Sequence, residues 1–308
     1  MFATTILVVT SFVLSLVGVE FFVRLSNGGR LTVRPNDRGS HVVPTPSGGG
    51  IVVYIIAAIA LIVHGNLFER SIDLLPFLVI GGVLTVVGFL DDLGHVRILV
   101  RLILHCVAAA ITVYLYLDIP LSQFGTDLSW IIWTGLIVLF INIYNFLDGS
   151  DGMVALQSVL VFSFWFVVSL MLGPDVAVVP GVLLGAWLGF LVHNWHPARL
   201  FMGDAGSTFV GYSVATVPLI LKTSLKFPDL TAVLAAMALS SPFIIDGVTT
   251  RLRLAFTTRR FWEPNRKHLY QIMIDSGFDQ RHVALVYSSI SLVVAVVLAW
   301  CSASFKFS

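Results

Sequence analysis

The sequence is poor in charged residues and in cysteine. Only 11% of its 308 residues are charged, and its two cysteines, Cys106 and Cys301, lie in separate apolar segments. We therefore expect no disulfide framework. The net charge of +1 indicates no particular partner, and nucleic acid is not among those we expect. No soluble domain, low-complexity segment or internal repeat is visible, and the longest hydrophilic stretch covers only residues 250–281. The chain is interpreted as one domain over residues 1–308.

Apolar residues dominate the chain instead. They make up 57% of it and give a mean hydropathy of +0.94, against roughly 45–50% apolar residues in soluble globular proteins. This composition predicts an integral membrane protein. Because a span needs about 20 largely apolar residues, we predict an all-α, polytopic fold with about ten transmembrane helices. The predicted spans are residues 3–23, 48–64, 74–90, 98–117, 129–146, 153–172, 176–192, 207–221, 230–249 and 282–302.

Basic residues predict the orientation of this bundle. Cytoplasmic loops carry an excess of Lys and Arg, and the loops after the odd-numbered spans hold 14 of the 18, with Arg101 assigned to the nearest of them. Both termini are therefore predicted to be periplasmic. The first 23 residues have no basic start and no A-x-A site before Arg24, so we expect a retained span rather than a cleaved signal peptide. The four basic residues on the other side are Arg70, Lys222, Lys226 and Lys306.

The strongly polar motifs all fall in the predicted cytoplasmic loops. The outer connections, such as GNLFERSID and GPD, look like plain turns. The five loops after the odd-numbered spans contain NDRGSHVVPTPSGGG, GFLDDLGHVR, NFLDGSDG, HNWHPARLFMGDAGS and RRFWEPNRKHLYQ. The sequence therefore predicts a single polar site at the cytoplasmic face.

Five carboxylates belong to these motifs, and they are Asp91, Asp92, Asp148, Asp151 and Asp204. A carboxylate at the end of a span is costly unless it meets water, a basic group or a cation. Oxygen ligands without Cys or paired His favour Mg²⁺ or Mn²⁺ over zinc, and Mg²⁺ usually keeps positions for substrate phosphates. With nearby Arg and His, the acids predict a diphosphate substrate. Glycines in SGGG, GSDG and GDAG allow backbone N–H groups to approach it, and helix N-termini after SGGG and GDAG would attract anions.

Each motif also has a simpler interpretation. The Asp91–Asp92 pair could be a solvated helix end, and Asp204 could cap the helix that follows it. Asp148 and Asp151 would share a face in a helix, but they could equally be Asx caps in a turn. The histidine of RKHLYQ could be a solvated surface residue. These alternatives explain each motif alone and do not explain why all of them fall on one membrane face.

The motifs PTPSGGG, GFLDDLGHVR, NIYNFLDGSDGM, HNWHPARLFMGDAGS and RKHLYQ, in this order and spacing, resemble the polyprenyl-phosphate N-acetylhexosamine-1-phosphate transferases. The likeness runs from about residue 34 to residue 282. Members use Mg²⁺ to transfer a sugar 1-phosphate from a UDP-sugar to undecaprenyl phosphate and release UMP. The resemblance implies a UDP-N-acetylhexosamine donor, undecaprenyl phosphate as acceptor, Mg²⁺ or Mn²⁺ as cofactor, and a bacterial inner-membrane location with the active site facing the cytoplasm.

The resemblance also implies roles for individual residues. Asp91 and Asp92 match the family's catalytic pair, with Asp92 also expected at the metal, and Asp204 matches the magnesium-ligating acid of its FMGD motif. His268 matches a catalytic histidine in the family's basic loop. The implied substrate contacts are Asn145, Asp148 and Asp151 of NxxDGxDG, Asn194 near the uridine pocket, Arg266 and Lys267 beside the histidine, and Arg34, Arg38 and His41 of the first loop.

Two details favour one branch of the family. The chain reads RKHLYQ where the phospho-MurNAc-pentapeptide translocase of cell-wall synthesis has three clustered histidines. Its VRPNDRGSHVVPTP loop resembles the enzymes that initiate O-antigen chains in lipopolysaccharide biosynthesis. The implied sugar is N-acetylglucosamine or a 6-deoxy relative such as N-acetylfucosamine or N-acetylquinovosamine. Residues 251–271 are expected to choose among them, with Phe261, Trp262 and Tyr270 as candidates for contacting a less hydroxylated sugar.

Two mechanisms fit these residues. In single displacement, Asp91 takes the last proton from the lipid phosphate, Asp204 with a neighbouring acid holds Mg²⁺ across the diphosphate, and His268 with Arg266 supports the leaving or transferred phosphate. The alternative is a covalent aspartyl-phosphosugar, with an Asp as nucleophile. The motifs favour single displacement without excluding the covalent route.

A different class, a secondary transporter or ion-coupled channel, would place its acids near the bilayer midplane and show two related halves. Only Asp246 of SSPFIIDGVTTRLR reaches deeper, and it is expected to pair with Arg251 or, less favourably, to contact substrate. An inactive lipid-binding scaffold is disfavoured because no motif acid is missing. The transferase is therefore the preferred interpretation.

Overall fold

The computed structural model describes residues 2–26, 29–33, 43–68, 74–94, 96–117, 126–225, 229–257 and 267–304. Helices make up most of this part of the chain, which confirms the all-α prediction. Two short strands, β1 (Thr32–Val33) and β2 (Thr45–Pro46), pair antiparallel. The helices are α1 (Phe2–Ser26), α2 (Gly50–Phe68), α3 (Leu75–Asp92), α4 (Ile98–Tyr116), α5 (Thr126–Leu147), α6 (Met153–Leu170), α7 (Val178–Asn194), α8 (Gly203–Leu225), α9 (Asp229–Leu239), α10 (Ser241–Thr257), α11 (Leu269–Asp275) and α12 (Gln280–Ser304).

Nine of the ten predicted spans coincide with one helix each. By length and composition, six described helices can cross a membrane, and α9 with α10 would count as a seventh if the bent pair is one span. Helices α2 and α7 are apolar but shorter. The chain is therefore a multi-pass membrane protein, whereas the count of ten spans stays a prediction.

The predicted span 230–249 is wrong as a single helix. It is broken at Ser240, where the two helical segments meet at 78°. Pro242 follows at the start of α10 and has no N–H to continue the helical ladder. Inside a membrane the freed groups need partners. Gln157 of α6 donates to the Leu239 carbonyl oxygen at 2.9 Å, and the Tyr144 hydroxyl lies 2.9 Å from Ser240 Oγ.

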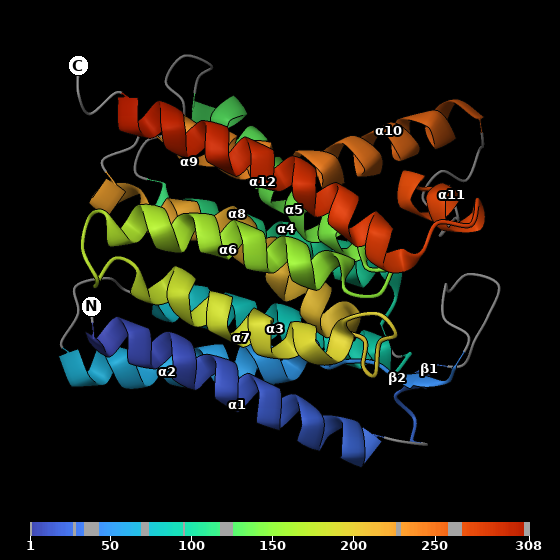
Figure 1. The fold of residues 1–308 in the computed structure, drawn as a ribbon. Coiled ribbons are helices and arrows are strands. Elements are labelled where there is room, and N and C mark those ends of the chain that lie inside the picture. Colours follow the sequence, from blue (N-terminus) through green and yellow to red (C-terminus); the bar gives the residue numbers. More distant parts are fainter. Residues whose placement is uncertain are drawn as a thin grey trace.

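The long helices run roughly side by side, whereas α10 and the short α11 are turned away from them, and the start of α1 and the end of α12 lie at one end of the bundle (Figure 1). Strands β1 and β2 and helix α11 lie at the opposite end. Phe201, two residues before α8, also lies at this opposite end, because its backbone amide donates to the Pro46 carbonyl oxygen of β2 at 2.9 Å. This arrangement agrees with termini on one side of the membrane. That this side is the periplasm stays a prediction.

Helices α1 and α7 approach each other at three glycines spaced four apart, Gly181, Gly185 and Gly189. A Cβ at Gly185 would lie 2.3 Å from the Val8 carbonyl oxygen, and one at Gly189 would lie 2.5 Å from that of Phe12. Small residues at this spacing let membrane helices pack with backbones in contact. Glycine is required here by the close approach of the α1 backbone.

The substitution Gly185→Ala is expected to lower the thermal midpoint of the purified protein in detergent. The added methyl meets backbone rather than a mobile side chain, so α1 must move, at a cost of about 1–3 kcal/mol. Gly135→Ala in α5 is the matched control, because a Cβ there meets nothing within 4 Å. Equal midpoints for the two variants would show that the α1–α7 contact is looser than described.

Candidate active site

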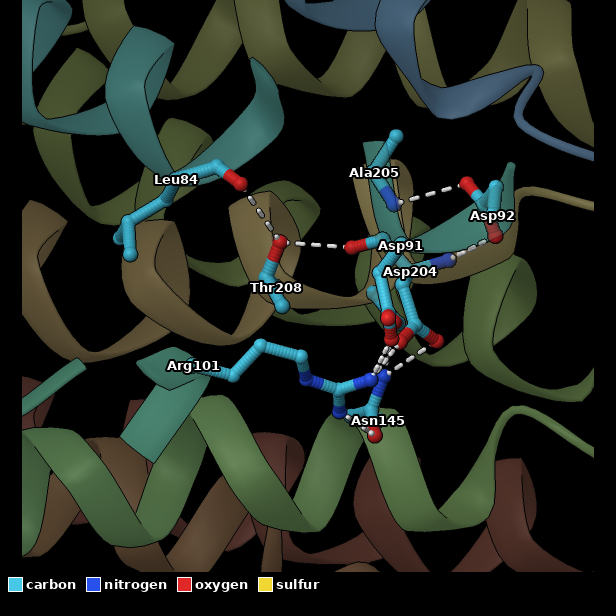
Figure 2. Close-up of polar contacts among 9 residues, drawn as sticks. Leu84, Asp91, Asp92, Arg101, Asn145, Asp204, Ala205 and Thr208 are labelled. Atoms are coloured by element: carbon cyan, nitrogen blue, oxygen red, sulfur yellow. Dashed lines mark hydrogen bonds and ion pairs between the residues drawn. The ribbon is translucent and has the colours of Figure 1, made fainter. Parts of the chain in front are cut away.

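Arg101, in the first turn of α4, lies at the centre of a polar cluster. Its Nη1 forms ion pairs with Oδ2 of Asp91 at the end of α3 and with Oδ2 of Asp204 at the start of α8 (Figure 2). Its Nη2 donates to Asn145 Oδ1, 3.3 Å away in the last turn of α5. Four helix ends therefore meet at one guanidinium. The predicted convergence of Asp91, Asn145 and Asp204 at one end of the bundle is confirmed.

Asn145 connects the two sides of this cluster. While its Oδ1 accepts from Arg101, its Nδ2 donates to Asp204 Oδ1 at 2.8 Å and to Ser207 Oγ at 2.9 Å. The side-chain amide is thereby fixed in one orientation, and both oxygens of Asp204 are engaged. A side chain that both donates and accepts is needed at position 145 to join a carboxylate to a guanidinium.

The two adjacent acids point in different directions. Asp91 faces Arg101, whereas Asp92 turns toward the start of α8, where its Oδ1 and Oδ2 accept the amides of Asp204 and Ala205 at 2.8 and 3.2 Å (Figure 2). Gly203, with φ +68°, leaves room for this contact, since a Cβ there would lie 2.4 Å from Asp92 Oδ2. The N-terminus of α8, expected to attract a substrate anion, therefore already binds the carboxylate of Asp92.

Close backbone contacts fix the position of Asp204. A Cβ at Gly88 of α3 would lie 2.4 Å from the Asp204 carbonyl oxygen, and one at Gly50 of α2 would lie 2.0 Å from Gly206 Cα. Thr208 Oγ1 donates to the same Asp204 carbonyl oxygen at 2.6 Å. Rigid helices thus hold the Asp204 side chain in place, as a preorganised site requires.

Asp148 lies in the turn after α5 and has no cationic partner among the described residues. Its carboxylate accepts no hydrogen bond from that part of the chain. Burial raises the pKa of Asp148 well above its usual value, and the negative charges of Asp204, Asp92 and Asp151 raise this pKa further. Such a carboxylate is costly unless a cation neutralises it. The group is therefore a candidate ligand for a divalent metal.

The donor set fits magnesium better than a metal with many protein ligands. Within the described ranges, no three His, Cys, Asp or Glu side chains are gathered around one point. Mg²⁺ is usually held by one or two carboxylates, with water and phosphate oxygens completing its shell. Asp148 is near enough to Asp204 for the charge of Asp204 to raise its pKa, so these two carboxylates are the candidate ligands. The predicted ligand role of Asp92 stays a prediction, beside its contact with α8.

Asp151 and Asn194 hold a loop rather than opening onto the acid cluster. Asp151 Oδ2 lies 2.7 Å from His196 Nδ1 and accepts the Ala198 amide at 3.0 Å. Asn194 accepts the Gly152 amide at 3.2 Å and donates to the Leu200 carbonyl oxygen at 2.9 Å. Both side chains are buried, so their polar atoms are engaged in joining residues 195–202 to the turn after α5. Their predicted contact with substrate stays a prediction.

The turn containing Asp148 and Asp151 decides between two interpretations of NFLDGSDG. Helix α5 ends at Leu147 and α6 begins at Met153, so the two acids do not share a helix face. Gly152 has φ +71°, a left-handed conformation that favours glycine. The turn, and not a continued helix, is therefore correct.

His268 is not a solvated surface residue. Its side chain is 3% exposed, and its Nδ1 lies 3.2 Å from Oδ1 of the buried Asp246. The ring centroid lies 6.5 Å from that of Phe146, the residue after Asn145, and 5.9 Å from that of Tyr270. Lys267 is exposed beside it. The predicted site residues Arg34, Arg38, His41 and Arg266, and the candidate aromatics Phe261 and Trp262, lie outside the described residues.

Two important residues had no place in the predicted site. Arg101 was used only to predict the orientation of the bundle. A basic residue inside an apolar helix, ten positions after Asp91, nevertheless indicates a partner for the motif acids. Asp246 was expected to pair with Arg251. Instead, Arg251 lies over the Phe146 ring, 3.9 Å from its centroid, and the carboxylate of Asp246 binds His268 and the start of α11.

Fold and site together define a multi-pass membrane protein with a cluster of acids and one arginine where its helix ends meet. Comparison with known sequences agrees with this class. Residues 74–222 match the family described as glycosyl transferase family 4. The decaprenyl-phosphate N-acetylglucosaminephosphotransferase of Mycolicibacterium smegmatis is 31% identical, over 84% of this chain and 72% of its own length.

Two other relatives carry related names. A phospho-N-acetylmuramoyl-pentapeptide-transferase from Symbiobacterium thermophilum is 32% identical over 65% of this chain and 67% of its own. A probable undecaprenyl-phosphate N-acetylglucosaminyl 1-phosphate transferase from Bacillus subtilis is 26% identical over 85% and 75%. The chain belongs to the polyprenyl-phosphate N-acetylhexosamine-1-phosphate transferases within glycosyl transferase family 4.

Proposed function

We propose that the protein transfers an N-acetylhexosamine 1-phosphate from a UDP-sugar to undecaprenyl phosphate, with Mg²⁺, at the cytoplasmic face of the bacterial inner membrane. The observation that carries the proposal is the cluster of Asp91, Asp204 and Asn145 around Arg101, near Asp148, for which the described part of the chain offers no cation. Fixed cations and anions of this kind suit a diphosphate and a metal ion. In this proposal the chain has ten spans with both termini periplasmic, and its product initiates O-antigen assembly.

In the proposed reaction, an oxygen of the lipid phosphate bonds to the sugar-bearing phosphorus and the bond to the UMP oxygen breaks. The anomeric C–O bond is untouched, and UMP leaves. Arg101 neutralises charge on the diphosphate, and Asp91 orients the acceptor and takes its last proton. When bound, Mg²⁺ would supply further charge neutralisation across the diphosphate, held by Asp204 with Asp148 or Asp92.

Purified protein in detergent tests this proposal directly. With UDP-N-acetylglucosamine, UMP release is expected only when both Mg²⁺ and undecaprenyl phosphate are present. Release without the lipid would point to a hydrolase, and no release under any combination would favour the transporter alternative. A panel of UDP-sugars then tests selectivity. N-acetylglucosamine is the first candidate, because it appears in the names of two of the relatives above.

The covalent route is tested by exchange. If an aspartyl-phosphosugar forms, labelled UMP will enter UDP-sugar in the absence of lipid acceptor. Single displacement predicts no such exchange. Exchange by the wild-type protein that is lost in Asp91→Asn would overturn single displacement and make Asp91 the nucleophile.

A further inference from the structure

Asp246 is a buried carboxylate that the proposed reaction does not use. It lies on α10, just after the break between α9 and α10, and its side chain is 1% exposed. A buried carboxylate is costly unless hydrogen bonds compensate it. Five groups bind it, and they are Thr250 Oγ1 at 3.1 Å, His268 Nδ1 at 3.2 Å, the Leu269 amide at 2.8 Å, the Tyr270 amide at 3.2 Å and the Tyr287 hydroxyl at 2.6 Å.

The carboxylate decides which nitrogen of His268 carries the ring proton. An ionised carboxylate only accepts hydrogen bonds, so Nδ1, which faces Asp246 Oδ1, donates. The backbone N–H of Gln271 is also placed to donate to the His268 side chain, within a capping box at the start of α11. The two partners call for opposite protonation of Nδ1, and the buried carboxylate, which bears the charge and can only accept, is the stronger of them. Nε2 is thereby left as the ring atom that can meet another group.

His268 lies beside the residue that follows Asn145. The centroids of the His268 and Phe146 rings are 6.5 Å apart, and Asn145, the residue before Phe146, binds both Arg101 and Asp204. On the other side of the turn, a Cβ at Gly149 would lie 2.0 Å from the Tyr270 hydroxyl. The start of α11 therefore contacts the segment 145–149 at Phe146 and at Gly149.

We propose that Asp246 is a positioning residue, which holds the His268 ring with Nδ1 protonated and Nε2 directed at the phosphate groups of the substrate. The proposal rests on the transferase function proposed above. In this proposal Asp246, on the second helix of the bent pair α9–α10, serves the transfer reaction and not ion transport. Asp246 itself touches no substrate and acts only through His268.

A double-mutant cycle tests this coupling. Asp246→Asn is expected to lower kcat about 10- to 100-fold, by analogy with groups that orient a metal-ligating histidine, with the KM for the UDP-sugar changed less than about threefold. In the His268→Ala background, Asp246→Asn should lower kcat no further. The same loss in both backgrounds would mean that Asp246 supports only the fold, and would overturn the proposal.

Tyr287→Phe is the matched control. It removes one hydrogen bond from Asp246 Oδ2 but leaves the contact between Oδ1 and His268. Its kcat should stay within about twofold of the wild type. If Asp246→Asn does not fold, Asp246→Glu in both backgrounds tests the same contact, because it keeps the charge and displaces the carboxylate.

A spectroscopic measurement separates this proposal from the transferase function. Nitrogen-15 NMR of histidine-labelled protein in detergent, with the His268 signals assigned by their loss in His268→Ala, reports which ring nitrogen is protonated. Protonated Nδ1 in the wild type and its loss in Asp246→Asn support the proposal, even if no transferase activity were found. Protonation at Nε2 in the wild type would refute it.

Discussion

Replacing Arg101 by Met is expected to lower kcat by roughly 10²- to 10³-fold, the loss typical of removing one charged donor from a preorganised site. Arg101 is the one described cation that contacts Asp91, Asp204 and Asn145 together. Without it, the diphosphate loses a fixed positive partner and two carboxylates face each other uncompensated. Arg101→Lys should recover only part of the activity, because an ammonium lacks the planar fork that reaches several acceptors. Steady-state UMP release measures both.

Arg97→Met provides the control for this experiment. Arg97 precedes α4 by one residue and is exposed, so its loss removes the same charge without touching the cluster. It should leave kcat within about twofold. The thermal shift caused by Mg²⁺ shows whether an inactive Arg101→Met protein has lost its contact with substrate or its metal site. If stabilisation by Mg²⁺ persists, the lost function is contact with substrate. Unchanged kcat in Arg101→Met would contradict the assigned site.

Hydropathy predicted most of the helices because lipid leaves a chain few choices. A span must satisfy its backbone internally and expose apolar side chains over about 20 residues. The break at Ser240 escaped this reasoning. Its apolar content resembles that of any span, and what permits the bend is a set of partners far away in the sequence, Gln157 on α6 and Tyr144 on α5.

The sequence predicted where the site lies, but not which partner each side chain in it binds. Alternating basic loops put the motif acids at one end of the bundle, and Asp91 and Asp204 do share a partner there. Periodicity could not show that Asp92 turns to the start of α8 while Asp91 turns to Arg101, because the directions of neighbouring side chains depend on packing at Gly203.

Asp246 shows the same limit more sharply. Its sequence neighbour Arg251 was the natural partner, yet the carboxylate binds a histidine 22 positions away and the amides that follow it. Unsatisfied N–H groups at a buried helix start need an acceptor, and the start of α11 meets α10 only in three dimensions. Composition and spacing therefore do not predict hydrogen bonds between polar groups that are far apart in the sequence.

Asp148→Asn is expected to change activity and stability in opposite directions. Desolvation, and then the negative charges of Asp204, Asp92 and Asp151, raise the pKa of the partly exposed Asp148. An amide at this position removes the cost of holding the carboxyl there, whether ionised or protonated, in the protein without metal. The thermal midpoint without Mg²⁺ should rise, by about 1–2 °C for each kcal/mol gained in a chain of this length. The same change removes a charged oxygen ligand, so kcat should fall by roughly 10²- to 10³-fold and the half-saturating Mg²⁺ concentration should increase.

Asp279→Asn is the matched charge-removing control. Asp279 is exposed, pairs with Arg281 and accepts its amide at 2.7 Å at the start of α12. Asparagine keeps the cap at this position, so the replacement should lower the midpoint at most slightly, through loss of an exposed ion pair, and leave both kcat and the Mg²⁺ response unchanged. An Asp148→Asn protein with a higher midpoint and full activity would show that this carboxylate carries a structural cost without a metal to justify it. A lower midpoint would instead show that Asp148 is already compensated in the protein without metal.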